Sequence, residues 1–304
     1  MFSLTAGRPI ARIREGEHDK QIIGLVESDP TGKETAHMND PIIVLGEDFF
    51  AERKTSTGRL RPQHLRELFV ALKADKEPDD DSLRELYLEA KEEFEARNRK
   101  EFTIGYGLVT PLPDGKRREC PYVCGPSGAG KSTYVSKLIH EMRIADPQTP
   151  LFVFSRLDKD DIIDIHHPQR VPLSADMKIT PEDVKQSICL FDDIDTIPDK
   201  KTFEVVQKLR DDLLETGRHE DVTVISTCHM MMNYKKTRVP LNEATSVTFF
   251  PGAGSSYHIK RYLKEHAGME KKMIEKILKL PSRWVTLYRR SPQYIIYEKG
   301  CFLL

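Results

Sequence analysis

The chain contains the run Gly125-Pro126-Ser127-Gly128-Ala129-Gly130-Lys131-Ser132-Thr133. This run matches the phosphate-binding pattern G-x-x-x-x-G-K-[ST] at every required position. A short apolar stretch at 121–124 precedes it, and a helix-compatible stretch at 131–142 follows it. Since the pattern requires a strand, a glycine-rich loop and a helix in this order, the sequence predicts a site for nucleotide phosphates here.

The chemistry of this loop follows from its residue types. Glycine allows backbone angles that other residues avoid, so the loop can turn its N–H groups toward a phosphate. The positive end of the following helix dipole would face the same anion. We expect Lys131 to contact the β- and γ-phosphates of ATP as a catalytic residue, and Ser132 to place its hydroxyl on Mg²⁺. The alternative is a glycine-rich turn that binds nothing.

A second candidate site lies further along the chain. The apolar stretch Ile188-Cys189-Leu190-Phe191 runs directly into Asp192 and Asp193. Phosphoryl-transfer sites need a metal-binding carboxylate beside the phosphate loop, so we expect Asp192 to bind Mg²⁺. Asp193 is the candidate catalytic residue that orients the attacking water. An acid pair at a turn, without a role in binding, is the alternative.

Two segments on either side of residue 220 offer further catalytic candidates. A predicted strand ends at Thr227, whose hydroxyl could sense the γ-phosphate or the water, and His229 is the second choice. Arg218 closes the helix before that strand. It is either an arginine finger, acting in its own or a neighbouring subunit, or a basic residue favoured by the helix dipole.

From about residue 116 the sequence alternates between strand and helix. Near-continuous apolar runs of strand length indicate a parallel sheet that is buried on both faces. The predicted strands are 121–124, 151–155, 188–192, 222–227 and 246–249, with helices at 131–143 and 202–216. The sequence therefore predicts a doubly wound, mainly parallel α/β sheet of the P-loop NTPase, RecA-like kind, and three short strands within 284–304.

Residues 1–115 have a different pattern. Short apolar runs at 22–26 and 41–45 favour strands, while 64–73 and 82–99 favour helices. We expect a separate mixed α/β module at 1–115, without a recognisable catalytic constellation, and an ATPase domain at 116–304.

The composition limits the possible partners and compartments. The formal net charge is −1, so contact with nucleic acid must come from a local basic patch or from the pore of an assembly. The odd number of cysteines, five, indicates reduced thiols and not a disulfide framework. No apolar run is long enough to cross a membrane, and the first residues lack the order of a signal peptide, so we expect an intracellular protein.

The motifs together resemble those of the FtsK–HerA superfamily of DNA-pumping ATPases, and within it the genome-packaging ATPases of large DNA viruses and related mobile elements. The resemblance lies in GPSGAGKST at 125–133, ICLFDDID at 188–195 and LLETGRHEDVTVISTCHM at 213–230, and it covers roughly residues 118–290. Two positions differ. Asp193 stands where many relatives have Glu, and Cys228 stands where cellular pumps often have Gln.

The resemblance implies ATP hydrolysis that drives double-stranded DNA through a ring of identical subunits. It also implies a capsid or portal as a partner, and a location in the host cytoplasm, the viral factory or the virion. A ring would multiply a few basic residues along its pore. The candidates, for which ordinary solvated charge is the alternative, are Lys235, Lys236, Arg238, Lys260, Arg261 and Lys264.

Two other functions would use the same loop. A P-loop kinase would transfer the γ-phosphate to a small molecule, but it would need an arginine-rich lid, which we do not find in the sequence. A nucleotide-binding scaffold protein would bind ATP without turnover. The second acid, Asp193, favours hydrolysis by water.

Overall fold

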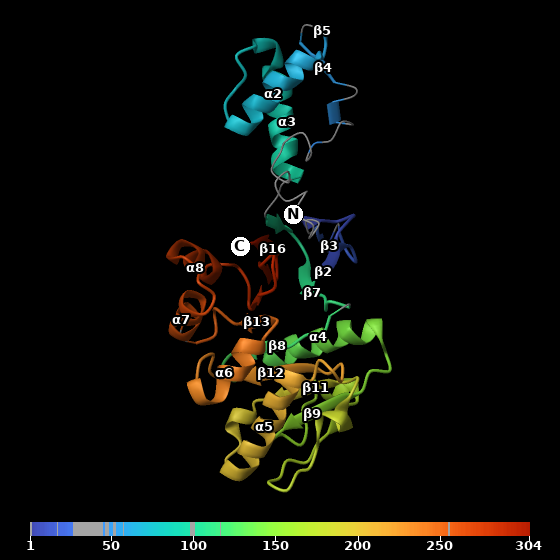
Figure 1. Cartoon of the computed structure of the whole chain (residues 1–304), viewed down its shortest axis with the longest axis vertical. Coiled ribbons are helices and arrows are strands. Elements are labelled where there is room, and N and C mark those ends of the chain that lie inside the picture. Colours follow the sequence, from blue (N-terminus) through green and yellow to red (C-terminus); the bar gives the residue numbers. More distant parts are fainter. Residues whose placement is uncertain are drawn as a thin grey trace. The chain divides into compact units, whose positions relative to one another are not determined.

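A computed structural model describes residues 2–16, 18–26, 45, 49–50, 53–56, 58–97, 101–115, 117–254 and 256–304 (Figure 1). The chain forms two compact units. Unit 1 comprises Met1–Arg8 and Gly24–Phe102, and unit 2 comprises Pro9–Ile23 and Thr103–Leu304. The sequence predicts a domain border near residue 115, and unit 2 also includes Pro9–Ile23 and residues 103–115, which precede that border.

Unit 2 is built on a large, mainly parallel sheet. Its central parallel strands are β9 (Leu151–Ser155), β11 (Ile188–Asp192), β12 (Thr223–Cys228), β8 (Pro121–Cys124) and β13 (Ser246–Phe249), in this spatial order. The predicted doubly wound α/β fold is thus confirmed. Four of these strands have the predicted bounds, and β12 lies one residue further along.

The edges of this sheet differ from its centre. The short strand β10 (Gln169–Arg170) adds in parallel beside β9. On the other side, β14 (Val285–Tyr288), β15 (Tyr294–Tyr297) and β16 (Gly300–Leu303) continue the sheet from β13 as an antiparallel meander. These are the three short strands predicted for the tail, and they extend the central sheet.

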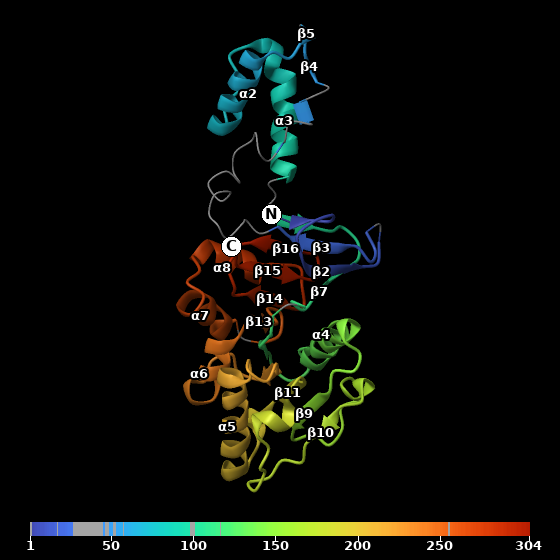
Figure 2. The ribbon, with the colours of Figure 1, turned by 45° about the vertical axis from the view of Figure 1, so that its right-hand side comes forward.

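Helices cover this sheet (Figures 1 and 2). The α-helices of unit 2 are α4 (Lys131–Ala145), α5 (Lys200–Thr216), α6 (Tyr234–Glu243), α7 (Tyr257–Glu265) and α8 (Lys271–Leu278). Short 3₁₀ turns are η2 (Asp164–His166), η3 (Pro181–Val184) and η4 (Ile194–Thr196). The helix α5 buries Leu213 in one apolar cluster with Phe191 and Val224. The helices α7 and α8 pack into another, with Val247 and Ile295.

A second strand pair in unit 2 lies beside α4. Strand β2 (Arg8–Arg14) pairs with β7 (Leu108–Pro111), so that Ala11 lies opposite Pro111. Arg12 and Arg14 both form ion pairs with Glu141 of α4, whose side chain is 1% exposed. This buried charge cluster fastens β2 to the helix that follows the phosphate loop.

Unit 1 is a small module of short strands and two helices. Phe2 and Ser3 of β1 (Phe2–Ser3) pair with Leu25 and Gly24 of β3 (Ile22–Leu25), and β4 (Lys54–Thr55) and β5 (Gly58–Arg59) form a hairpin. Helices α2 (Pro62–Ala74) and α3 (Arg84–Arg97), the latter preceded by η1 (Asp81–Leu83), share an apolar core that includes Leu68 and Leu86. Strand β6 (Glu101–Thr103) follows α3. The strand predicted at 41–45 lies outside the described residues, apart from Leu45.

Two whole-chain expectations concern cysteines and membrane spans. All five cysteines are buried and free. Within the described ranges, none of the helices combines the length and the apolar character that a membrane crossing needs.

Candidate nucleotide-binding site

The predicted phosphate loop joins β8 to α4 at the carboxyl edge of the parallel strands. Gly130 is the residue before α4 and has a left-handed backbone (φ 105°), which glycine adopts without strain. A Cβ atom at Gly125 would lie 2.7 Å from the ring of Phe250, so only glycine lets the loop pass this close. The first turn of α4 carries no acidic side chain. Its free N–H groups and dipole therefore favour an anion.

Lys131 connects this loop to the acidic end of β11. Its side chain is 7% exposed. The Nζ atom donates a hydrogen bond to the carbonyl oxygen of Gly125 (2.9 Å) and lies 3.2 Å from Oδ2 of Asp193. The structure thus brings together the two segments that the sequence singled out. Ser132 follows half-buried, and Thr133 is exposed.

Thr227 lies between the two neighbouring acids. Its Oγ1 atom accepts a hydrogen bond from the backbone N–H of Asp193 (2.8 Å). The same hydroxyl lies 2.8 Å from Oδ1 of Asp192 and 3.1 Å from Oδ1 of Asp193, and can donate its one proton to either. Strand β12 separates β8 from β11 in the sheet, which places Thr227 directly beside the acids.

The two acids point to the same place because the chain turns sharply between them. Successive residues of a strand face opposite sides, but Asp193 leaves β11 with a left-handed backbone (φ 45°). Burial raises the pKa of the Asp192 carboxyl, and the negative charge of Asp193 raises it further. Hydrogen bonds from Thr227 and from Ser155 (3.1 Å) oppose this effect.

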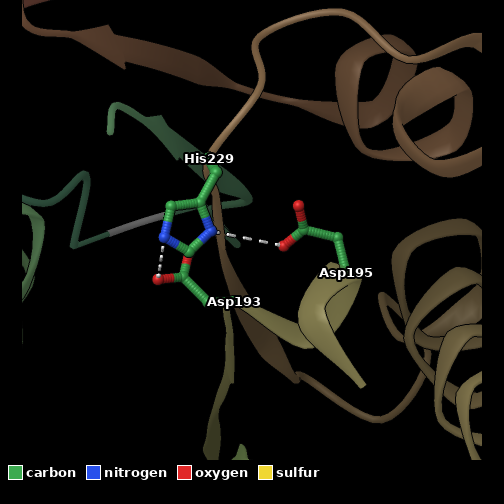
Figure 3. A group of neighbouring side chains, drawn as sticks. All are labelled: Asp193, Asp195 and His229. Atoms are coloured by element: carbon green, nitrogen blue, oxygen red, sulfur yellow. Dashed lines mark ion pairs between the residues drawn. The ribbon is translucent and has the colours of Figure 1, made fainter. Parts of the chain in front are cut away.

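A histidine lies between two carboxylates at this site (Figure 3). The Nε2 atom of His229 lies 3.4 Å from Oδ2 of Asp193, and its Nδ1 atom lies 3.9 Å from Oδ1 of Asp195. That Oδ1 atom is buried and has no hydrogen-bond partner within the described part of the chain. Asp195 is therefore a third acid at this edge, and the cationic side chain of Lys131 lies against Asp193.

These residues fit a bound divalent cation with a triphosphate. Mg²⁺ prefers oxygen ligands and is usually held by one or two carboxylates together with substrate phosphates. The negative charge gathered around Asp192, and the buried oxygen of Asp195 without a partner, are compatible with such a cation. Ser132 and Asp192 are the residues that the sequence predicts as its ligands.

Sequence reasoning missed two residues of this edge. Ser155 ends β9 and donates to Asp192, and Asp195 lies in η4 opposite His229. A usable signal was present for both. Polar residues that end adjacent parallel strands meet at one edge of the sheet, and the run of acids after β11 continues past Asp193.

Arg218 lies at the opposite edge of the sheet. It is exposed, in the turn between α5 and β12, while Thr227 lies near the far end of that strand. The six residues of β12 span about 20 Å at 3.3 Å per residue. One side chain cannot cover this distance, so Arg218 does not reach the nucleotide site of its own subunit.

The surroundings of the loop include a cavity of about 140 Å³. It lies between the start of the loop and the residues after β12 and β13. Gly125, Pro126, Met231, Phe250 and Ile259 are among its lining residues. This cavity connects the loop to the first turn of α7.

The glycine loop, the partly buried lysine and the acid-tipped strand define this protein as a P-loop NTPase. The loop and the acid-tipped strand, with β12 between their strands, are the segments on which the sequence resembles the FtsK–HerA type of ATPases.

No protein-family model matches the chain. "Uncharacterized protein V3" of Sputnik virophage is 38% identical over 208 residues, which are 67% of this chain and 84% of that protein. The chain therefore belongs to the same family as this virophage protein.

Solved structures similar to this chain include two ATPases. The genome packaging NTPase B204 from Sulfolobus turreted icosahedral virus 2, in complex with AMP, is 13% identical with a TM-score of 0.43, over 60% of this chain and 97% of that one. The cytoplasmic domain of the Thermomonospora curvata type VII secretion ATPase EccC is 12% identical with a TM-score of 0.44, over 66% and 29% of the two chains.

Proposed function

We propose that the chain is an ATP-hydrolysing motor that moves double-stranded DNA, and that its task is to package a viral genome into a capsid. One observation carries the enzymatic part. The Nζ atom of Lys131 lies within reach of both the phosphate loop and the acid Asp193. A hydrolase needs this combination, because phosphate binding and water activation must occur at one place.

Each residue of the site has a separate role in ATP hydrolysis. Lys131 exchanges Asp193 for the β- and γ-phosphates when ATP enters, since the more highly charged phosphate competes for the ammonium group. Asp193, released from that ion pair, accepts a hydrogen bond from the attacking water and orients it toward the γ-phosphate. Ser132 and Asp192 would hold Mg²⁺, and this ion would supply positive charge to the bound triphosphate.

Thr227 transmits the state of the site to the sheet. Its hydroxyl contacts Asp192 and the backbone of Asp193, so a shift of either acid on hydrolysis changes its hydrogen bonds. We assign it the sensor role, with His229 holding Asp193 from the other side. Arg218 serves a neighbouring subunit, since it lies at the opposite edge of its own sheet.

The DNA and packaging parts of the proposal have separate support. The relative comes from Sputnik virophage, which supports a viral context, and the sequence resembles packaging ATPases over roughly 118–290. A ring of identical subunits would bring Arg218 to a neighbour's nucleotide and would surround the DNA. A capsid or its portal would anchor that ring.

The test is an ATPase assay on the purified full chain, with and without linear duplex DNA, beside a mass measurement of the assembly. We expect turnover that duplex DNA stimulates, in a multimeric species. Phosphate transfer to an added small molecule would indicate a kinase. ATP binding without turnover would indicate a scaffold protein. Either result would contradict the motor.

A further inference from the structure

Positive charge is concentrated in one helical pair of unit 2. Residues 257–283 contain eight Lys and Arg residues and three Glu residues, while the whole chain has a net charge of −1. This segment includes α7 and α8, which lie side by side in both views (Figures 1 and 2). We call the exposed basic side chains of these two helices the α7–α8 face.

The two helices present this charge on a fixed support. Each is strongly amphipathic: Ile259, Tyr262 and Leu263 of α7 are buried, as are Ile274 and Ile277 of α8. These side chains pack into the apolar cluster that also holds the strands β13, β14 and β15. The basic residues therefore project from helices whose other faces are anchored to the central sheet.

Several lysines of this face form no ion pair. Lys260, Lys264, Lys272 and Lys279 are exposed, and no ion pair involves them within the described ranges. Two pairs do form within the helices, Arg261 with Glu265 and Lys271 with Glu275. The uncompensated lysines leave a positive surface that attracts anions.

The other basic segment predicted for a pore is less available. Lys236 of α6 donates a hydrogen bond to the carbonyl oxygen of Asp195 (2.8 Å) and lies over the ring of Phe203 (4.7 Å). Its charge is thus used within the subunit. Among the described residues, the α7–α8 face has several exposed lysines without ion pairs on one anchored surface.

We propose that the α7–α8 face binds the sugar-phosphate backbone of duplex DNA; the proposal rests on the motor function proposed above. Duplex DNA carries one negative charge per about 1.7 Å of its axis, and backbone binding requires no base contacts. Lysine provides a flexible point charge suited to such sequence-independent contact. A motor that translocates any genome sequence needs contacts of this kind.

The same helix pair is connected to the phosphate loop. His258 and Ile259, in the first turn of α7, line the 140 Å³ cavity together with Gly125 and Pro126 of the loop. Phe250 packs against Gly125 and follows β13 directly. The chain then continues from Phe250 to the start of α7. A movement of the loop on nucleotide binding would therefore shift α7 through these contacts. In that case DNA and nucleotide should alter each other's affinity by the same factor.

The experiment compares two triple variants of the full chain with equal loss of charge. The first is Lys260→Gln, Lys264→Gln and Lys272→Gln. The control is Lys185→Gln, Lys201→Gln and Lys208→Gln, at exposed lysines outside α7 and α8 that form no ion pair within the described ranges. Binding of a fluorescent linear duplex is measured by anisotropy across a salt series. ATP turnover without DNA and thermal unfolding show that both variants fold.

We expect the slope of log K against log salt to fall by up to about 2.7 in the first variant, because each lost phosphate contact removes about 0.9. The control should keep the slope of the wild type. Equal slopes in both variants would overturn the proposed surface while leaving the motor intact. If the wild-type protein itself shows no ATP turnover, the proposed motor function is refuted instead. Binding of the face to phosphatidylserine vesicles, with DNA binding unchanged, would assign it to a membrane and overturn the proposal.

Discussion

The Nζ atom of Lys131 lies 3.2 Å from Oδ2 of Asp193. These residues are distant in sequence, one after the glycine-rich loop and one after β11, and the sheet brings them into an ion pair. Because the same ammonium group is expected to contact the β- and γ-phosphates, we expect ATP to compete with Asp193 for it.

Replacement of Lys131 by Ala should abolish tight ATP binding, because the β- and γ-phosphates lose their one partly buried cationic partner. Titration with a fluorescent ATP analogue measures this. Lys137→Ala is the matched control, since Lys137 lies on the same helix but is exposed. Unchanged affinity in Lys131→Ala would remove the loop from the site.

For Asp193→Asn we expect ATP binding to be retained and turnover to fall by about 10²–10⁴-fold, the usual contribution of a positioned acid or base. The amide keeps the shape of the side chain but loses the charge that orients water. Parallel measurement of nucleotide affinity and steady-state turnover separates the two effects. Turnover at the rate of the wild type would exclude Asp193 from catalysis.

Replacement of Thr227 by Val removes a hydroxyl that contacts both acids while keeping the shape of the side chain. The backbone N–H of Asp193 and Oδ1 of Asp192 then lose this partner in a place where Thr227 is 4% exposed, while Oδ2 of Asp192 keeps its hydrogen bond from Ser155. We expect a loss of about 1–3 kcal/mol in the free energy of unfolding, together with reduced turnover. Full turnover at reduced stability would leave Thr227 with a structural role alone.

The Arg218→Ala variant should lose ATP turnover, and this loss should depend on which subunits are neighbours in the assembly. Arg218 lies before the start of β12, at the edge of the sheet opposite its own nucleotide site, so any catalytic role requires a neighbour. Mixing this variant with Lys131→Ala subunits should restore part of the activity, because some interfaces then combine an intact Arg218 with an intact loop. A monomeric protein with full activity after Arg218→Ala would end the arginine-finger role.

The double variant Arg12→Ala and Arg14→Ala tests the ion pairs between β2 and α4, the helix that follows the phosphate loop. It leaves the buried Glu141 carboxylate without its two partners. Removing the partners of a buried charge costs about 3–5 kcal/mol, so chemical denaturation should show a loss of this size. A stability close to that of the wild type would mean that β2 is not fastened to α4 by this cluster.

The central sheet could be predicted from the sequence because its signals are local. Runs such as Leu151–Ser155 and Ile188–Asp192 are apolar throughout, as buried parallel strands are, and the loop pattern fixes where the first strand ends. The same reasoning placed Lys131, Asp192 and Thr227 at one edge, because the carboxyl ends of parallel strands lie at the same edge of a sheet.

Other features depend on contacts between distant residues and left no local signal. The ion pairs of Arg12 and Arg14 with Glu141 join segments far apart in sequence, so the border between the units could not be read near residue 115. The left-handed backbone at Asp193 turns its carboxylate toward Lys131, whereas an extended strand would have directed it away.

The most direct measurement is a structure of the full chain with Mg²⁺ and a non-hydrolysable ATP analogue. The account predicts the triphosphate within the loop at 125–133, with the Nζ atom of Lys131 moved from Asp193 to the phosphates and the metal between Ser132 and Asp192. A triphosphate bound elsewhere, or a Lys131 that stays paired with Asp193 while the analogue is bound, would contradict it.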